Sequence, residues 1–211
     1  MGGAQSVWLA DTPEPGLENT YSTGGKQQGT FLLGLALEKT FTTPVNNFET
    51  AMGVEVDYLK NASMTGGIVQ PMVNVDPNFD TLNYAYSMKS YLLLATARAS
   101  KLNILPKLGA YLQGGVGAAL NKLTHYTETS PDGSSSAPML APFGDGSNKK
   151  FAYSIGAGVV CQVGKSSQVL IGYRYINSGM GGFKTSPVQQ TNNTLHFSPI
   201  THHFLTLTLS V

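Results

Sequence analysis

The sequence predicts an all-β fold, and specifically an eight-stranded antiparallel up-and-down β-barrel. Two observations support this prediction: apolar and polar residues alternate along much of the chain, and short connections between the alternating segments take turns with long ones. Alternation at a period of two is typical of a strand with one apolar and one polar face. No segment shows a helical period with capping residues. We therefore interpret residues 1–211 as one all-β domain, a length that a single barrel commonly reaches.

The alternation is clearest at the end of the chain, where Leu205, Leu207 and Leu209 alternate with Thr206 and Thr208. Six other segments show a similar pattern, with boundaries fixed to within about two to four residues. The seven predicted strands are Thr30–Phe41, Phe48–Lys60, Asn83–Arg98, Lys107–Tyr126, Lys150–Val163, Val169–Ser178 and Ile200–Val211.

The lengths of the connections predict an eighth strand. Short links at 43–47, 101–106 and 164–168 alternate with long ones at 61–82, 127–148 and 179–199. The strand at 30–41 then begins on the long-loop side, so another strand must precede it, and Val7–Ala10 is the candidate. Both termini then lie at one end and four long loops at the other. Eight is an even number, as in bacterial single-chain outer-membrane barrels, and short turns opposite long loops are typical of that class.

Composition excludes several classes of function. Charged residues make up 12% of the chain, about half the share usual in soluble domains, and the formal net charge is +1. The chain lacks the surplus of basic residues that would indicate nucleic-acid binding. The single Cys161 excludes an intramolecular disulfide and a cysteine-rich metal site. No apolar run reaches the length of a membrane helix, and no export signal opens the chain, so we expect such a signal to have been removed if the protein is exported.

The apolar parity of each strand predicts an outer, lipid-facing surface. A cation on the lipid-facing surface destabilises a membrane barrel by roughly 2–4 kcal/mol at the bilayer midplane and by little near the interface. The cations that share the apolar parity all lie near strand ends, where this cost is small. These cations are Lys39, Lys60, Arg98 and Lys122. The predicted outer residues include Leu33, Leu35, Val54, Val56, Met88, Leu92, Leu94, Leu112, Val116, Ile155, Val159, Ile171, Leu205 and Leu207.

Aromatic residues predict a girdle at each edge of that surface. Toward the long loops we expect Tyr58, Tyr84, Tyr86, Phe151, Tyr153, Tyr173 and Tyr175, and toward the short turns Phe41 and Phe48. A soluble barrel or sandwich also alternates and also carries aromatic residues in its strands, so a soluble ligand-binding barrel stays an alternative.

The opposite parity predicts a packed polar interior of small residues with a few ionisable ones. The ionisable residues are Glu38, Glu55, Asp57, Lys89 and Arg174, which we expect to form a buried charge network. One interpretation is a gate or narrow water path. The other, which we favour, is charge neutralisation inside a filled barrel, because a buried charge must be paired.

Three segments resemble the small outer-membrane barrels of Gram-negative bacteria, the outer membrane protein A transmembrane domain and opacity-protein type. They are SIGAGVVCQVGKSSQVLIGYRYIN (154–177), GAYLQGGVGAAL (109–120) and AMGVEVDYL (51–59). The resemblance implies a transmembrane barrel in the outer membrane, with its long loops outside the cell. Members of that group usually end in an aromatic residue, whereas this chain ends in Val211.

The group that the chain resembles spans structural anchors, adhesins and enzymes, and for this chain we predict a non-enzymatic protein with a structural or surface role, such as adhesion. The expected partners are outer-membrane lipid and lipopolysaccharide, with a host or surface ligand for the long loops. We predict no cofactor, no metal site and no catalytic residue. A small porin-like pore is one alternative. A lipid A-modifying enzyme is another, because His196 and Ser198 have the spacing of a base and a nucleophile in such a barrel, although no carboxylate follows in the last strand to orient the histidine.

Overall fold

A computed structural model of the chain describes residues 7–10, 18–23, 30–43, 47–61, 64–70, 80–129, 143–164, 167–185 and 196–210. In these ranges the backbone forms strands and the turns and bends between them. None of the described residues belongs to a helix long and apolar enough to cross a membrane.

Twelve strands lie in the described ranges, in agreement with the predicted all-β fold. They are β1 (Val7–Ala10), β2 (Glu18–Thr23), β3 (Thr30–Thr43), β4 (Phe48–Asn61), β5 (Met64–Gln70), β6 (Asp80–Leu105), β7 (Leu108–Thr129), β8 (Phe143–Gly144), β9 (Gly146–Gln162), β10 (Gln168–Gly182), β11 (Lys184–Thr185) and β12 (His196–Ser210).

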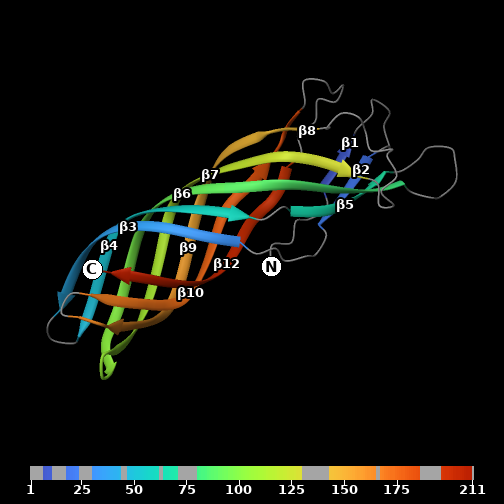
Figure 1. Ribbon diagram of the computed structural model, residues 1–211. Coiled ribbons are helices and arrows are strands. Elements are labelled where there is room, and N and C mark those ends of the chain that lie inside the picture. Colours follow the sequence, from blue (N-terminus) through green and yellow to red (C-terminus); the bar gives the residue numbers. More distant parts are fainter. Residues whose placement is uncertain are drawn as a thin grey trace.

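Seven long strands form one antiparallel sheet that curls around an interior (Figure 1). Their order is β3-β4-β6-β7-β9-β10-β12, so strands that follow one another along the chain are also neighbours in the sheet. The prediction of an antiparallel up-and-down fold is therefore confirmed. We call the end with the connections 44–47, 106–107 and 163–167 the short-turn end, and the other the long-loop end.

The predicted position of Val7–Ala10 is wrong. This segment, β1, pairs with β2, which pairs with β5, and β5 lies along the Asp80–Tyr86 part of β6. The three strands thus extend the sheet at its long-loop end instead of providing an eighth long strand beside β3. The four-residue segment is too short to signal its pairing partner, and strand pairing is not local in sequence.

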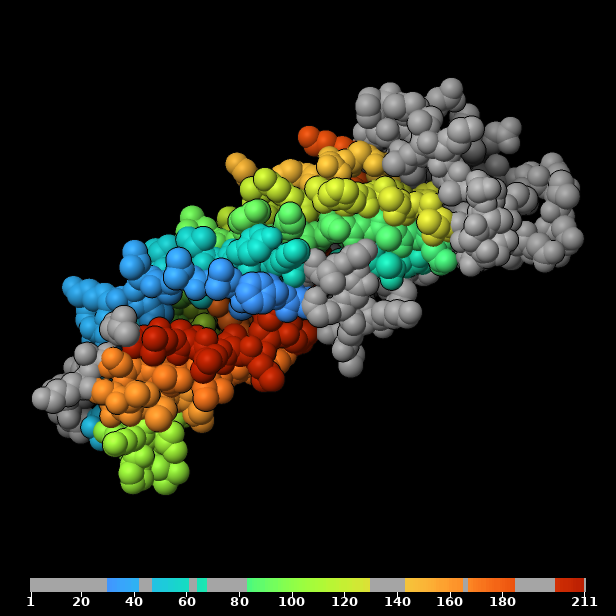
Figure 2. Space-filling view, in the orientation of Figure 1, coloured from blue at the N-terminus to red at the C-terminus, as the bar shows by residue number. Residues whose placement is uncertain are grey.

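The two outermost long strands, β3 and β12, run in the same direction, because six antiparallel pairings separate them and an even number restores the direction. Among the described residues, β3 pairs only with β4, and β12 pairs only with β10. Both border the same face of the molecule in Figure 2, β3 in blue and β12 in red. Their side chains are the most exposed on the sheet, with Leu37 at 85% and Leu205 at 91%.

A two-residue turn joins β6 to β7 at the end of the link that the sequence predicts over 101–106, so β6 continues to Leu105 instead of ending at Arg98. Leu105 pairs with Leu108, and Pro106 and Lys107 form the turn. The fixed φ of proline suits the first turn position, and Lys107 takes a φ of 63° at the second.

A β-bulge on β7 changes which side chains point inward at the long-loop end. His125 has a φ of 58°, and the register with β6 shifts between Ala85 and Ser87. One extra residue reverses the alternation, so that Leu123 below the bulge and Tyr126 above it are both buried.

Glycines allow an aromatic ring to lie flat against β9 and β10 on the inner face. A Cβ on Gly172 would lie 2.3 Å from the hydroxyl oxygen of Tyr111 and 2.5 Å from the carbonyl oxygen of Ala157. A Cβ on Gly114, which faces outward on β7, would meet no atom closer than 3.9 Å.

We therefore expect Gly172→Ala to destabilise the protein by about 1–3 kcal/mol, because the added methyl group overpacks the contact with Tyr111. Gly114→Ala is the matched control and should leave stability unchanged or raise it slightly. Urea unfolding of the two variants measures the difference. Equal midpoints would contradict the close packing of Tyr111 on Gly172.

Candidate functional site

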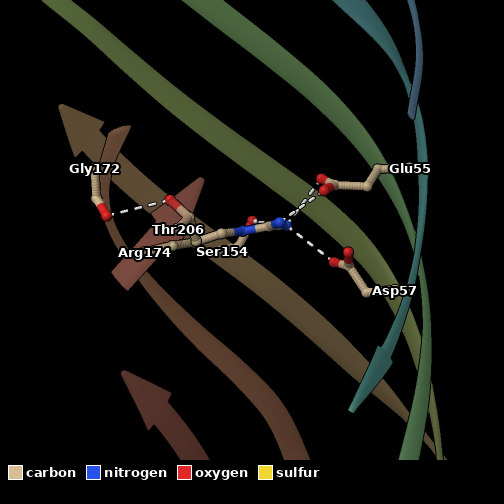
Figure 3. A network of polar contacts seen from close by, with 6 residues as sticks. All are labelled: Glu55, Asp57, Ser154, Gly172, Arg174 and Thr206. Carbon is tan, nitrogen blue, oxygen red and sulfur yellow. Dashed lines mark hydrogen bonds and ion pairs between the residues drawn. The ribbon is translucent and has the colours of Figure 1, made fainter. Parts of the chain in front are cut away.

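The interior of the curled sheet holds an ion-pair group centred on Arg174 of β10 (Figure 3). Its guanidinium group donates to both carboxylate oxygens of Glu55, from Nη1 at 2.7 Å and from Nη2 at 2.9 Å. Nη2 also lies 3.1 Å from Oδ2 of Asp57 and 3.2 Å from Oγ of Ser154. The two-pronged contact with Glu55 uses the planar fork of arginine, which lysine lacks.

These contacts cross the interior. Arg174 lies on β10, whereas Glu55 and Asp57 lie on β4, and around the sheet these strands are separated by β6, β7 and β9. Asp57 is fully buried, and a Cβ on Gly34 of β3 would lie 2.2 Å from its Oδ1. The absence of a side chain at Gly34 therefore makes room for the carboxylate.

A second ion-pair group lies nearer the short-turn end, around Arg98 of β6. Its Nη2 is 3.2 Å from Oε2 of Glu38 and 3.8 Å from Oε1 of Glu49. Gln168 of β10 donates to Oε2 of Glu49 at 3.2 Å, so this group also joins β4 to β10 across the interior. Each group contains one arginine and two carboxylates.

Three apolar clusters fill the interior around these ion pairs. The long-loop end holds a mostly aromatic cluster, the middle an aliphatic one, and the short-turn end a smaller one. The first contains Tyr84, Tyr86, Met88, Leu123, Tyr126, Phe143 and Phe183; the second Leu59, Leu92, Leu94, Ala119, Ala152, Ile176 and Phe204; the third Leu102, Tyr111, Val160 and Leu170. The interior is thus more apolar than predicted, and its polar side chains gather around the ion pairs and a hydrogen-bonded group at Asn121.

The aromatic cluster closes the interior at the long-loop end. The ring of Tyr126 lies 5.2 Å from the rings of Phe143 and Phe183, and Phe183 lies 5.3 Å from Tyr86, all edge to face. This geometry is the favoured one for aromatic pairs. Below it, Asn121 accepts a hydrogen bond from Ser90 and donates one to the carbonyl of Ser178, linking β6, β7 and β10.

The structure brings together four of the five residues of the predicted charge network, in two groups. Glu55, Asp57 and Arg174 form one, and Glu38 belongs to the other. Lys89 was predicted inside and is exposed on the outer face, so this part of the prediction is wrong. Arg98, predicted on the outer face, is 6% exposed and occupies the interior instead.

The same reversal affects the whole of β6. Met88, Leu92 and Leu94 were predicted to face outward and are buried, whereas Tyr91 and Leu93 are exposed. Leucines occupy both parities of SYLLLATARA (90–99), so the apolar pattern gives no clear direction there, and a shift by one residue exchanges the two faces.

Seven of the nine predicted girdle residues lie on the outer face. Phe41, Phe48, Phe151, Tyr153 and Tyr173 are exposed, and Tyr58 and Tyr175 are half-buried. The prediction for Tyr84 and Tyr86 is wrong, because they belong to the interior aromatic cluster. Tyr91, which the sequence analysis missed, is exposed and packs against Tyr58 at 5.2 Å between ring centroids.

Groups that could perform chemistry are few in the described part of the chain. It contains no cluster of three His, Cys, Asp or Glu side chains placed to hold a metal ion. His202 is buried and His203 is exposed, where its Nδ1 contacts the hydroxyl of Tyr173. The side chains of His196 and Ser198 lie outside the described residues.

Comparison with known proteins gave no match to a family model, to a curated protein or to a solved structure. The resemblance to small outer-membrane barrels therefore stays a prediction.

We expect Arg174→Met to destabilise the protein by about 3–5 kcal/mol, because Glu55 and Asp57 lose the cation that pairs with them in a buried setting. Combining it with Glu55→Gln and Asp57→Asn should restore much of the loss, since no buried charge then remains in this group. Urea unfolding of the single and the triple variant under the same conditions measures the two changes in the free energy of unfolding.

Lys89→Met is the matched control, since it removes a cation at the position first predicted to be interior. It should change the unfolding free energy by less than about 0.5 kcal/mol, as is usual for an exposed substitution. A loss as large as that of Arg174→Met would contradict the outward direction of Lys89.

Proposed function

We propose that the protein is an integral outer-membrane β-barrel of Gram-negative bacteria, without enzymatic activity, that serves a structural or surface role. The observation that carries this proposal is an apolar belt on the outer face of all seven long strands. Leu35, Met52, Leu93, Val116, Ile155, Ile171 and Leu207 represent one strand each and are 54–82% exposed. Soluble monomers rarely expose a continuous apolar surface of this extent.

The height of the belt supports a lipid environment. On β6 it is bounded by the exposed Lys89 and Lys101, which are about 40 Å apart along the strand at ~3.3 Å per residue. At the tilt of about 45° usual for membrane strands, this distance corresponds to roughly 28 Å along the bilayer normal. The apolar band of outer-membrane barrels is about 25 Å tall.

The side chains packed in the interior support a structural role over a porin-like pore. The three apolar clusters and the two ion-pair groups lie at both ends and in the middle of the interior. A water path would have to pass the packed rings of Tyr126, Phe143 and Phe183. We expect the protein, reconstituted in planar bilayers, to show no single-channel conductance above background.

The first test is gel mobility of the protein refolded in detergent, with and without boiling. A closed membrane barrel resists the detergent and migrates differently until it is heated. We expect a shift, together with solubility only in detergent. A well-behaved monomer in plain buffer that shows no shift would reject the membrane proposal and favour the soluble ligand-binding barrel.

A substitution in the belt gives a second test. Val116 lies near the middle of the belt on β7 and is 55% exposed. Val116→Arg should weaken folding into bilayers by about 2–4 kcal/mol, the cost of a cation at the midplane. Thr127→Arg, at an exposed position of the same strand beyond the belt, is the control and should cost about 1 kcal/mol or less. Equal effects of the two variants would contradict a bilayer around the belt.

A further inference from the structure

Three lysines form a row across neighbouring strands on the outer face. Lys60 of β4 pairs directly with Lys89 of β6, and Lys89 pairs directly with Lys122 of β7. All three side chains are exposed. The row lies at the long-loop edge of the apolar belt, and Lys149 of β9 lies two residues closer to the belt, opposite Leu120.

This row is electrostatically unfavourable without an anionic partner. Directly opposed residues have Cβ atoms about 4.5–5.5 Å apart, and like charges at such positions destabilise a sheet. The carboxylates of Glu38, Glu49, Glu55 and Asp57 are bound to Arg98 or Arg174 on the inner face, so they do not neutralise the row. The positions that flank the row in the sheet, Phe31 on β3 and Ser147 on β9, are uncharged.

The surroundings of the row fit the headgroup region of a lipid. Just toward the belt, the rings of Tyr58 and Tyr91 pack at 5.2 Å, and Nζ of Lys122 lies 5.8 Å from the centroid of Tyr91. Paired tyrosines beside an apolar surface are typical of the interface between bilayer and water. The Lys60–Lys89 pair lies two residues farther from the belt than the Tyr58–Tyr91 pair, which in the proposed membrane is the side of the headgroups.

We propose that Lys60, Lys89 and Lys122 form a binding surface for the phosphate groups of lipids in the leaflet at the long-loop end. This inference rests on the proposed membrane location. A phosphate group offers several oxygens and one to two negative charges, so it can accept hydrogen bonds from neighbouring ammonium groups at once. The acyl chains of the same lipid would cover the belt below, which commits the surface to a lipid instead of a free anion.

The test is native mass spectrometry of the refolded protein after exposure to mixed micelles of phosphatidylcholine and phosphatidic acid. The wild type should retain phosphatidic acid in preference to phosphatidylcholine. The variant K60Q/K89Q/K122Q should lose this preference, by about fivefold for each lysine removed. The matched control K39Q/K101Q/K107Q removes three exposed lysines from the short-turn end and should keep the preference.

Thermal unfolding gives a readout that general charge attraction would not produce. In phosphatidylcholine vesicles, Lys89→Gln should raise the unfolding temperature, because it relieves repulsion within the row. In vesicles of four parts phosphatidylcholine and one part phosphatidic acid, the wild type should gain more stability than the variant. Equal loss of lipid preference in both triple variants, or the same effect of Lys89→Gln in both kinds of vesicle, would overturn the proposal.

Two further arms separate the sources of failure. Displacement of phosphatidic acid by millimolar inorganic phosphate alone would mean that the row binds free phosphate, which overturns the lipid assignment. If the wild type shifts on the gel when boiled and inserts into phosphatidylcholine vesicles, yet shows no lipid preference, only the lysine proposal fails. If the wild type neither shifts on the gel nor inserts into the vesicles, the membrane proposal fails, and the lysine proposal fails with it.

Discussion

The ion pairs that cross the interior hold the sheet in its curled shape. In the described residues no backbone ladder joins β3 to β12, so hydrogen bonds between neighbouring strands alone would permit the sheet to open. The fork of Arg174 on Glu55 and the bond from Gln168 to Glu49 instead join β10 to β4, the strands next to the two outermost ones. Both contacts are shielded from water, which strengthens them and makes the loss of one partner costly.

The two kinds of basic residue are separated by the sheet. The chain contains two arginines, Arg98 and Arg174, and both are buried and paired with carboxylates. The lysines whose side chains are described are all exposed. The physical difference is clear: guanidinium is weakly hydrated and matches two oxygens at once, whereas ammonium is strongly hydrated and reaches water on a flexible stem. The arginines therefore pair with carboxylates inside the sheet, and the described lysines lie at its surface.

The sequence predicts the strands well because their signal is local, and it fails where the signal is not. On β4, β7, β9, β10 and β12, one parity is apolar and the other is small or polar, and the predicted faces agree with the structure. On β6 leucines occupy both parities. The face that points inward could have been predicted from Arg98, since Glu38 and Glu49 need a buried cation and arginine suits that role better than lysine.

Two other features depend on contacts that no local pattern records. The aromatic cluster combines Tyr84 and Tyr86 with Phe143 and Phe183, which are about 60 to 100 positions away in the sequence. The bulge at His125 reverses the alternation from which the direction of Tyr126 would be predicted. The eighth long strand was predicted from the alternation of short and long connections. In the structure β1 instead pairs its backbone with β2.

The apolar character of both faces determines which environment suits this sheet. A soluble barrel hides one apolar face and presents a polar one, yet here Leu92 and Leu94 pack inside while Leu93 between them is 56% exposed. Each leucine left in water forgoes about 1.5–3 kcal/mol relative to burial. Across seven strands the belt leaves unused more burial energy than the 5–15 kcal/mol by which proteins are usually stable. Under the proposed membrane location an apolar medium would cover the belt, and the exposed lysines at its two edges would lie where that medium meets water.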